Sequence, residues 1–197
     1  MRADARKNYD QLLDVAGVVL AEEGADASLR DIARRADVGL ATLYRHFPTR
    51  EALLEALLRT GFDDLTAQAG ELEASRAPDE ALVVWLREFV ACAARYQGVV
   101  TLMVAAIEDP GSALHASCVA MRASGARLLA RAQEAGTARR DLDGADLYAL
   151  AGALAWLSDQ SALADRTDHL FDVVAEAILV GSKRERAGTS SSTWPSR

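Results

Sequence analysis

The chain has 197 residues, of which 50% are hydrophobic and 26% are charged, a composition typical of a globular protein with a sizeable core. The formal net charge is -7, two cysteines give no disulfide framework, and no run of 18 uninterrupted apolar residues occurs. These properties exclude disorder for most of the chain. With an N-terminus that lacks the apolar core of a signal peptide, they predict a cytoplasmic protein without a membrane partner.

The first predicted element is a helix over about residues 3–23. Apolar residues recur in it at the spacing of a buried stripe, among them Leu12, Ala16 and Leu20, and Gly24 is placed to end it. We expect this helix to be one part of a three-helix unit.

Two short helices and a tight turn are predicted next, within residues 28–50. Ser28 is suited to cap the first helix, with Asp31 completing a variant of the capping box. The turn contains Gly39, which is free to take a positive φ, and Asp37, which tolerates one. Five arginines against two aspartates give this stretch a local charge of +3, so the remaining residues carry -10.

The second short helix has an apolar inner face and a polar, aromatic outer face. Leu43 and Phe47 lie four residues apart and anchor the inner face, and Pro48 stops the helix. Two helices joined by a short glycine-containing turn describe a helix-turn-helix whose second helix fits a major groove.

The segment Thr42-Leu43-Tyr44-Arg45-His46-Phe47, followed by Arg50, resembles the DNA-binding domain of the TetR family of transcriptional regulators. The similarity covers roughly the first 60 residues, and departs from the family at Asp37, where glycine is more common. The resemblance implies that Ser28, Tyr44, His46 and Arg50 bind phosphate and that Thr42 reaches a phosphate or a base. Base reading is then left to Arg30, Leu40, Ala41 and Arg45. The predicted DNA-binding residues are Ser28, Arg30, Leu40, Ala41, Thr42, Tyr44, Arg45, His46 and Arg50.

The whole chain is predicted to be all-α, in four segments. Residues 1–48 form the DNA-binding domain, 49–74 a connecting helix of nearly 40 Å, and 75–181 a helical dimerisation and effector-binding domain. Residues 182–197 form a tail predicted to be disordered.

The second half contains five further predicted helices, over about 79–96, 99–107, 112–134, 144–164 and 168–181. Periodicity alone also allows a buried strand at 99–107, but no second strand is available to pair with it, which favours a helix. The Gly-x-x-Arg-x-Asp-Leu segment that begins at Gly136 also resembles the family.

Two sets of apolar residues in this half are candidate binding surfaces. The first either lines a pocket for an apolar or aromatic small-molecule effector or fills the core: Trp85, Phe89, Tyr96, Met103, Met121 and Trp156, with Gln160 as a polar partner. The last two helices are too apolar to be covered by one chain, and in the family they form the dimer interface. The predicted interface residues are Leu150, Leu154, Leu157, Phe171, Val174 and Ile178.

The sequence supplies no pattern for catalysis and no convincing metal site. It has no nucleophile elbow, phosphate-binding glycine loop or HExxH motif, and His115 and Cys118 lack a third metal ligand. We therefore expect neither an enzyme nor a cofactor. The predicted function is a homodimeric repressor that binds a pseudo-palindromic operator in double-stranded DNA and is released by a small-molecule effector. The alternative is a helical protein-interaction module without sequence-specific DNA binding.

Overall fold

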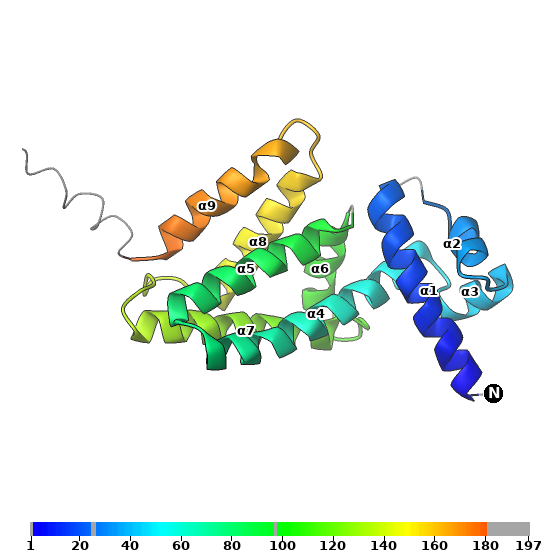
Figure 1. Ribbon diagram of the computed structural model, residues 1–197, viewed down its shortest axis with the longest axis horizontal. Coiled ribbons are helices and arrows are strands. Elements are labelled where there is room, and N and C mark those ends of the chain that lie inside the picture. Colours follow the sequence, from blue (N-terminus) through cyan, green and yellow to red (C-terminus); the bar gives the residue numbers. More distant parts are fainter. Residues whose placement is uncertain (1, 25–26, 97, 181–197) are drawn as a thin grey trace, which may run out of the picture.

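The computed structural model describes residues 2–24, 27–96 and 98–180, which form an all-α protein (Figure 1). Three helices make the N-terminal unit: α1 (Arg2–Glu23), α2 (Leu29–Arg35) and α3 (Leu40–His46). The tail predicted for residues 182–197 lies outside the described residues.

Local sequence signals fix the ends of the first two helices. Gly24 ends α1 with φ 56°, and the Ser28 hydroxyl caps α2 by accepting a hydrogen bond from the Asp31 amide at 3.0 Å. The Gln11 side chain donates to the Ala36 carbonyl at 2.8 Å, which ties α1 to the end of α2. The two helices therefore meet at a fixed point beside the turn.

In the turn between α2 and α3 the left-handed backbone conformation is adopted by an aspartate and not by the glycine. Asp37 takes the left-handed conformation with φ 52°, whereas Gly39 has φ -60° and starts α3 from an extended conformation. The departure from the family at Asp37 thus falls on the residue with the left-handed backbone, and aspartate is among the few non-glycine residues that tolerate it.

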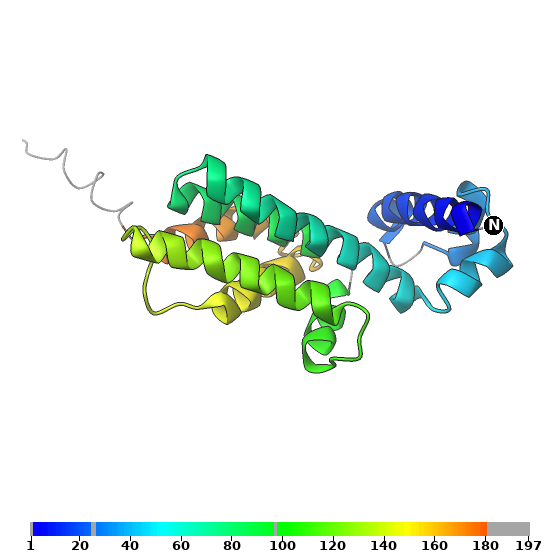
Figure 2. The same cartoon turned by 90° about the horizontal axis from the view of Figure 1, so that it is seen from below.

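A single long helix, α4 (Arg50–Ser75), joins the N-terminal unit to the rest of the molecule (Figure 2). Thr49 caps it by accepting a hydrogen bond from the Ala52 amide at 3.1 Å. Its first turns pack against α1 and its later turns against α5 and α7, so one rigid element contacts both parts of the protein.

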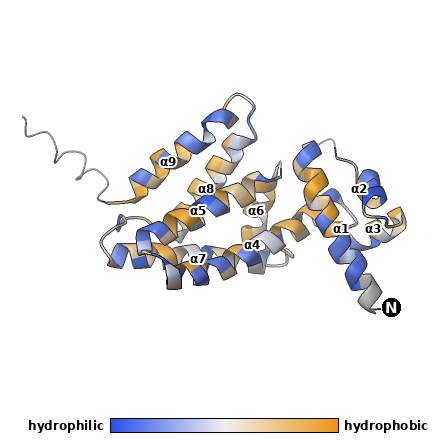
Figure 3. Ribbon diagram, viewed as in Figure 1, coloured by the Kyte–Doolittle hydropathy of each residue, from blue (hydrophilic) through white to orange (hydrophobic). Residues whose placement is uncertain are grey.

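The C-terminal body contains α5 (Pro78–Ala94), α6 (Val99–Glu108), α7 (His115–Glu134), α8 (Gly144–Ser158) and α9 (Thr167–Ile178). Hydrophobic and hydrophilic residues alternate along α5, α7 and α9, whereas α6 and α8 are mainly hydrophobic, and α2 and the first half of α1 are mainly hydrophilic (Figure 3). This alternation is the pattern of helices that bury one face and leave the other in solvent.

Several predicted boundaries differ from the structure. α8 ends at Ser158, six residues before its predicted end, and a turn and a 3-10 helix at Ala164–Arg166 precede α9. α7 begins at His115, because Ser112 lies in the preceding turn, where its hydroxyl accepts from the Leu114 amide. The segment 99–107 is a helix, as predicted, but Val104 is exposed and only one side is covered.

The end of the described chain is pinned to the linker between α7 and α8. The Arg139 amide donates to the Ile178 carbonyl at 2.9 Å, and the Val180 amide donates to the Thr137 carbonyl at 2.8 Å. Together they form an isolated antiparallel bridge, and this bridge is the nearest approach to β-structure in the described residues.

No single helix of the described residues has the length and hydropathy of a membrane span. Only α5 and α6 taken together have the length and composition of a membrane span, and the two helices are bent by 107° at their junction.

Candidate nucleic-acid interface

The outer face of α3 carries exposed side chains that could contact DNA. Tyr44, a large aromatic residue, is 48% exposed, and its neighbours on the helix Arg45 and Ala41 are also exposed. An Arg45 Nη2 donates to Thr42 Oγ1 at 3.0 Å, which orders the guanidinium along the helix surface. These hydroxyl and guanidinium groups are the donors that phosphate oxygens and base edges accept.

The opposite side of α3 is held firmly in the core. Leu43 and Phe47 are buried, and the Tyr9 ring lies against Phe47 and against the edge of the His46 ring, with the Tyr9–His46 centroids 5.7 Å apart. Tyr9 in turn accepts a hydrogen bond from Arg59 of α4 at 3.0 Å. The predicted phosphate ligand His46 is therefore half-buried, and its ring is oriented by α1.

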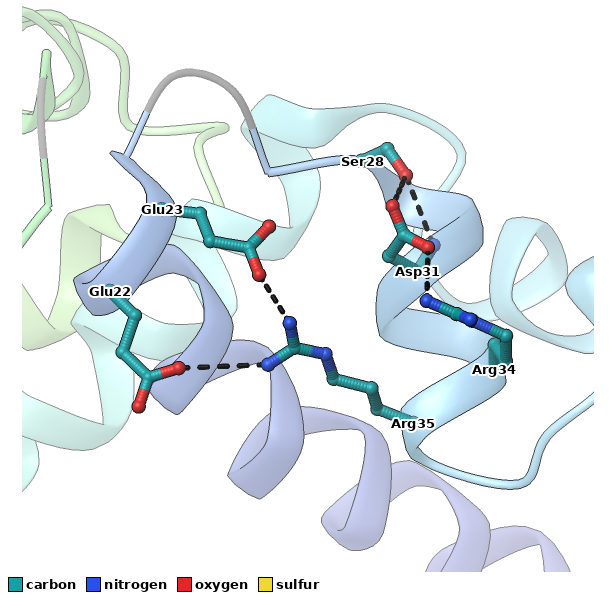
Figure 4. Close-up of polar contacts among 6 residues, drawn as sticks. All are labelled: Glu22, Glu23, Ser28, Asp31, Arg34 and Arg35. Atoms are coloured by element: carbon teal, nitrogen blue, oxygen red, sulfur yellow. Dashed lines mark hydrogen bonds and ion pairs between the residues drawn. The ribbon is translucent and has the colours of Figure 1, made fainter.

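The start of α2 is a tight polar cluster (Figure 4). The Ser28 hydroxyl donates to the Asp31 carboxylate at 2.7 Å, and Arg34 pairs with the same carboxylate at 2.8 Å. The hydrogen bond from Ser28 lowers the pKa of Asp31, and the charge of Arg34 adds to the effect. Because the carboxyl is easier to ionise when folded, this interaction stabilises α2 at neutral pH and is lost as the pH falls through that pKa.

The three arginines of α2 differ in what they contact. Arg35 pairs with Glu22 and Glu23 of α1, and Arg34 with Asp31, whereas Arg30 is exposed and has no ion pair among the described residues (Figure 4). Arg30 is the one of the three whose guanidinium is available to a ligand without breaking such a contact. Leu40, the first residue of α3, is half-buried.

Arg50 has an internal role that its sequence position did not suggest. Its guanidinium donates to the carbonyls of Gly24 and Ala27, both at 2.6 Å, and so clasps the loop between α1 and α2 from the first turn of α4. Ala27 is buried, so this loop end is fixed to the core. The contact links the connecting helix directly to the start of the helix-turn-helix.

Replacing Arg50 by lysine should weaken this loop, although the positive charge is kept. A lysine has no planar fork to reach two carbonyls at once, and losing hydrogen bonds from a charged donor costs about 1–3 kcal/mol. We expect faster hydrogen exchange at residues 27–32 and a lower melting temperature for R50K, with R50A affected at least as much. A lysine variant as stable and as protected as the parent would show that the clasp contributes nothing.

The seven predicted pocket residues are not gathered around one cavity. Trp85, Phe89, Met103 and Met121 are buried in the packed core of the body, where Trp85 Nε1 donates to the Leu65 carbonyl at 3.0 Å. Their side chains pack between helices, and this burial fits both a filled core and the wall of an enclosed pocket, so their role in effector binding stays a prediction.

The other three lie in different places. Tyr96 lines a pocket of about 720 Å³ between α1, α4 and the end of α5. Trp156 is 52% exposed on the outer side of α8, and the half-buried Gln160 donates back to the Trp156 carbonyl in the turn after that helix.

The predicted dimer residues also divide into two groups. Leu154, Phe171 and Ile178 are buried within the single chain, so they cannot form the contact surface of a partner without unfolding. Phe171 lies beneath the Arg87 guanidinium, 4.0 Å from its ring centroid, and Arg87 also pairs with Asp172 at 2.7 Å.

The outward face of the last two helices nevertheless carries an apolar strip, bordered by the exposed Asp168, His169, Asp172 and Glu176 of α9. Trp156 and Val173 are about half exposed, Ala153 and Ala177 are exposed beside them, and the predicted Leu150, Leu157 and Val174 are half-buried at the margin. Helical periodicity identified the apolar helices correctly but could not say which apolar stripe the chain covers itself.

The two cysteines and His115 lie in packed parts of the body, away from any group of metal ligands among the described residues. Burial raises the pKa of both the Cys92 and the Cys118 thiols to about 11, which disfavours the reactive thiolate. His115 Nδ1 lies 2.8 Å from the Ala106 carbonyl, and no group of three metal-ligating side chains occurs among the described residues.

Comparison with known proteins places both halves of the chain in one family. Residues 12–57 match the family model for bacterial regulatory proteins of the tetR family, and residues 77–178 match the model for the C-terminal domain of SbtR-like transcriptional regulators. Over 78 residues the chain is 41% identical to the HTH-type transcriptional repressor KstR2 of Rhodococcus jostii, a match that spans 37% of this chain and 38% of that protein.

Two solved structures are similar over nearly their whole length. A TetR transcriptional regulator of Streptomyces coelicolor is 34% identical, with 88% of this chain and 99% of that one covered and a TM-score of 0.65. A TetR regulatory protein of Mycobacterium vanbaalenii is 35% identical, with coverage of 91% and 99% and a TM-score of 0.59. The chain therefore belongs to the TetR family of transcriptional regulators.

Proposed function

We propose that the protein is a repressor that binds a pseudo-palindromic operator as a homodimer and is released when a small-molecule effector binds. The observation that carries the proposal is the exposed face of α3. Tyr44 and Arg45 are presented to solvent while Leu43 and Phe47 on the same helix are buried, so the donors project from a rigid support. Of the predicted DNA ligands, Ser28 and Arg50 are engaged in contacts within the chain, so we assign them the additional task of positioning α2.

The homodimer is supported by the apolar strip on the outward face of α8 and α9 that one chain leaves uncovered. A two-fold axis through this face would pair two N-terminal units, each carried at the far end of α4 (Figure 1). We call each N-terminal unit of α1, α2 and α3 a DNA reader. Two readers related by a two-fold axis require an operator with two inverted half-sites.

Release by an effector follows from α4, which contacts both parts of the molecule. An effector bound to the body changes the separation of the two readers only if it has different affinities for the two arrangements of α4. Distances between labels on the two α3 helices, measured with and without a proven effector, test this step.

Selection from random duplex DNA with the purified protein tests the proposal. We expect an enriched inverted repeat, bound by one dimer with an affinity that falls steeply as salt rises, because phosphate contacts release counterions. Weak binding at low salt only, with no enriched sequence, would favour a helical protein-interaction module instead.

Placing a charge on the face of α8 and α9 should separate the subunits. Trp156→Glu or Val173→Glu buries a carboxylate against an apolar partner surface, and loss of such an anchor costs about 2 kcal/mol or more, roughly 30-fold in the dimer dissociation constant. Sedimentation velocity at micromolar concentration measures the change. Val104→Glu introduces the same charge at an exposed valine of α6 and serves as the control. A dimer unaffected by both W156E and V173E would place the interface elsewhere.

A further inference from the structure

A pocket of about 720 Å³ is lined by residues of α1, of α4 and of the C-terminal end of α5. Its size is that of a small-molecule site, for which 300–1,000 Å³ is usual. One wall belongs to the DNA-binding unit and the others to the connecting helix and the body. The residues predicted from sequence to line an effector pocket contribute only Tyr96 to it.

The lining of the pocket is partly apolar, and its apolar residues range from the buried Tyr96 to Val18, which is 55% exposed. Leu13 and Val18 of α1 face it from one side, and Leu57 of α4 and Tyr96 from the other. Tyr96 is 7% exposed, and its hydroxyl comes so close to α1 that a Cβ on Gly17 would stand 3.3 Å from the oxygen. Carbon groups of a ligand therefore find surface to cover on two helices.

The rim of the pocket is acidic. Four carboxylates and a single guanidinium, that of Arg95, are the charged groups of its lining. Asp10 and Glu22 have surface partners, Arg6 at 3.7 Å and Arg35 at 3.6 Å. Such exposed pairs are weak and screened by salt, so they leave most of the negative field in place.

Two of the four carboxylates are unengaged. Asp14 on α1 and Asp64 on α4 line the pocket from different walls, and neither has a hydrogen bond or ion pair among the described residues. Both side chains are exposed at the rim, so they attract a cation together with the other two carboxylates, through the net negative charge of the lining.

We propose that this pocket binds an organic monocation, an ammonium group carried on an apolar body, and that such a cation is the effector of the proposed repressor. The proposal rests on that proposed function for its regulatory part. The apolar part of the lining takes the carbon body, and Asp14 and Asp64 take the charge. Because the ligand contacts both α1 and α4, its affinity depends on the angle between the N-terminal unit and the body.

Coupling between the pocket and DNA then follows from linkage. If the cation fits better when the readers are positioned away from operator spacing, it lowers operator affinity, and the operator lowers cation affinity by the same factor. Couplings between sites are typically 5- to 150-fold, and we expect a change in that range.

The test uses 4-phenylbutylamine, which is a cation at neutral pH, and the neutral 4-phenylbutanol, which has the same carbon body. Calorimetric titration of the full chain without DNA should show saturable binding of the amine, at least tenfold tighter than the alcohol. The double variant D14N/D64N should lose at least tenfold in amine affinity and little in alcohol affinity. The matched control E71Q/E134Q removes two exposed carboxylates of the body and should bind the amine like the parent.

The outcomes separate the site from the repressor. No saturable amine binding, equal binding of the alcohol, or an equal loss in E71Q/E134Q would overturn the site. Carboxylate-dependent binding by a protein that selects no operator would uphold the site and sink the repressor. Where an operator is selected, the amine should weaken its binding to the parent and not to D14N/D64N, and an unchanged operator affinity would overturn the role of the cation as effector.

Discussion

Replacing Trp85 by alanine is expected to lower the free energy of unfolding by about 3–5 kcal/mol, the usual cost of emptying a large buried aromatic site. Trp85 is 1% exposed and stands where α5 meets α4 and α7. Its indole donates to the Leu65 carbonyl at 3.0 Å, and its ring lies 5.5 Å from the Phe89 ring, centroid to centroid. The cavity would open at the centre of the body, where neighbouring helices cannot collapse into it. Denaturant unfolding at a fixed protein concentration measures the loss, since a dimer's stability depends on concentration.

A double-mutant cycle with Gly125 shows whether the tight fit of the indole is responsible. A Cβ on Gly125 of α7 would lie 2.5 Å from Trp85 Cη2, so G125A alone should overpack the site and cost about 1–3 kcal/mol. Phenylalanine at position 85 vacates that space, and the alanine methyl then fills part of it. We expect W85F/G125A to be more stable than the sum of the single effects by at least about 0.5 kcal/mol. Strict additivity would contradict the contact between the two residues.

The sequence was sufficient to predict the helices whose ends are set locally. Ser28, Thr49 and Pro78 begin helices through capping or a fixed φ, and Gly24 and Gly136 follow helix ends with positive φ. These signals act within four residues, so no knowledge of the fold was needed. The end of α8 shows the opposite case. Residues 159–166, which follow α8, contain no Gly or Pro, and the Asp159 carboxylate instead accepts a hydrogen bond from the amide of Gly98, a residue distant in sequence.

The binding surfaces depended on tertiary packing and were harder to predict. Trp156 and Phe171 both occupy apolar positions of amphipathic helices, yet one is exposed and the other buried under Arg87. The place of Arg50 in a motif predicted a phosphate ligand. Its hydrogen bonds to the carbonyls of Gly24 and Ala27 form only in the folded protein, where α4 lies next to these residues, so they could not be predicted from the sequence. A cavity formed by three helices has no sequence pattern in any one of them. The acidic pocket between α1, α4 and α5 could therefore not be predicted from the positions of aromatic residues.

On the selected operator, replacing Arg45 by alanine should reduce affinity by about 5- to 150-fold for each half-site, the loss of about 1–3 kcal/mol expected for each guanidinium contact to a base edge. Arg45 is exposed on α3 and is oriented by its hydrogen bond to Thr42, so little ordering cost opposes its binding. The preference at one base pair of each half-site should disappear with the side chain. The slope of log affinity against log salt should stay the same, because the side chain reads a base rather than neutralising a phosphate.

Tyr44→Phe should behave differently although the residue is next to Arg45. Removing one hydroxyl that donates to a phosphate costs roughly ten- to a hundredfold in affinity on every sequence alike, and leaves the base preferences intact. Arg140→Ala removes an exposed arginine from the body and controls for net charge. Equal losses in R45A and R140A would mean that long-range charge, not α3, determines binding. A salt slope smaller by about 0.9 for each half-site in R45A would instead show that Arg45 contacts a phosphate and not a base.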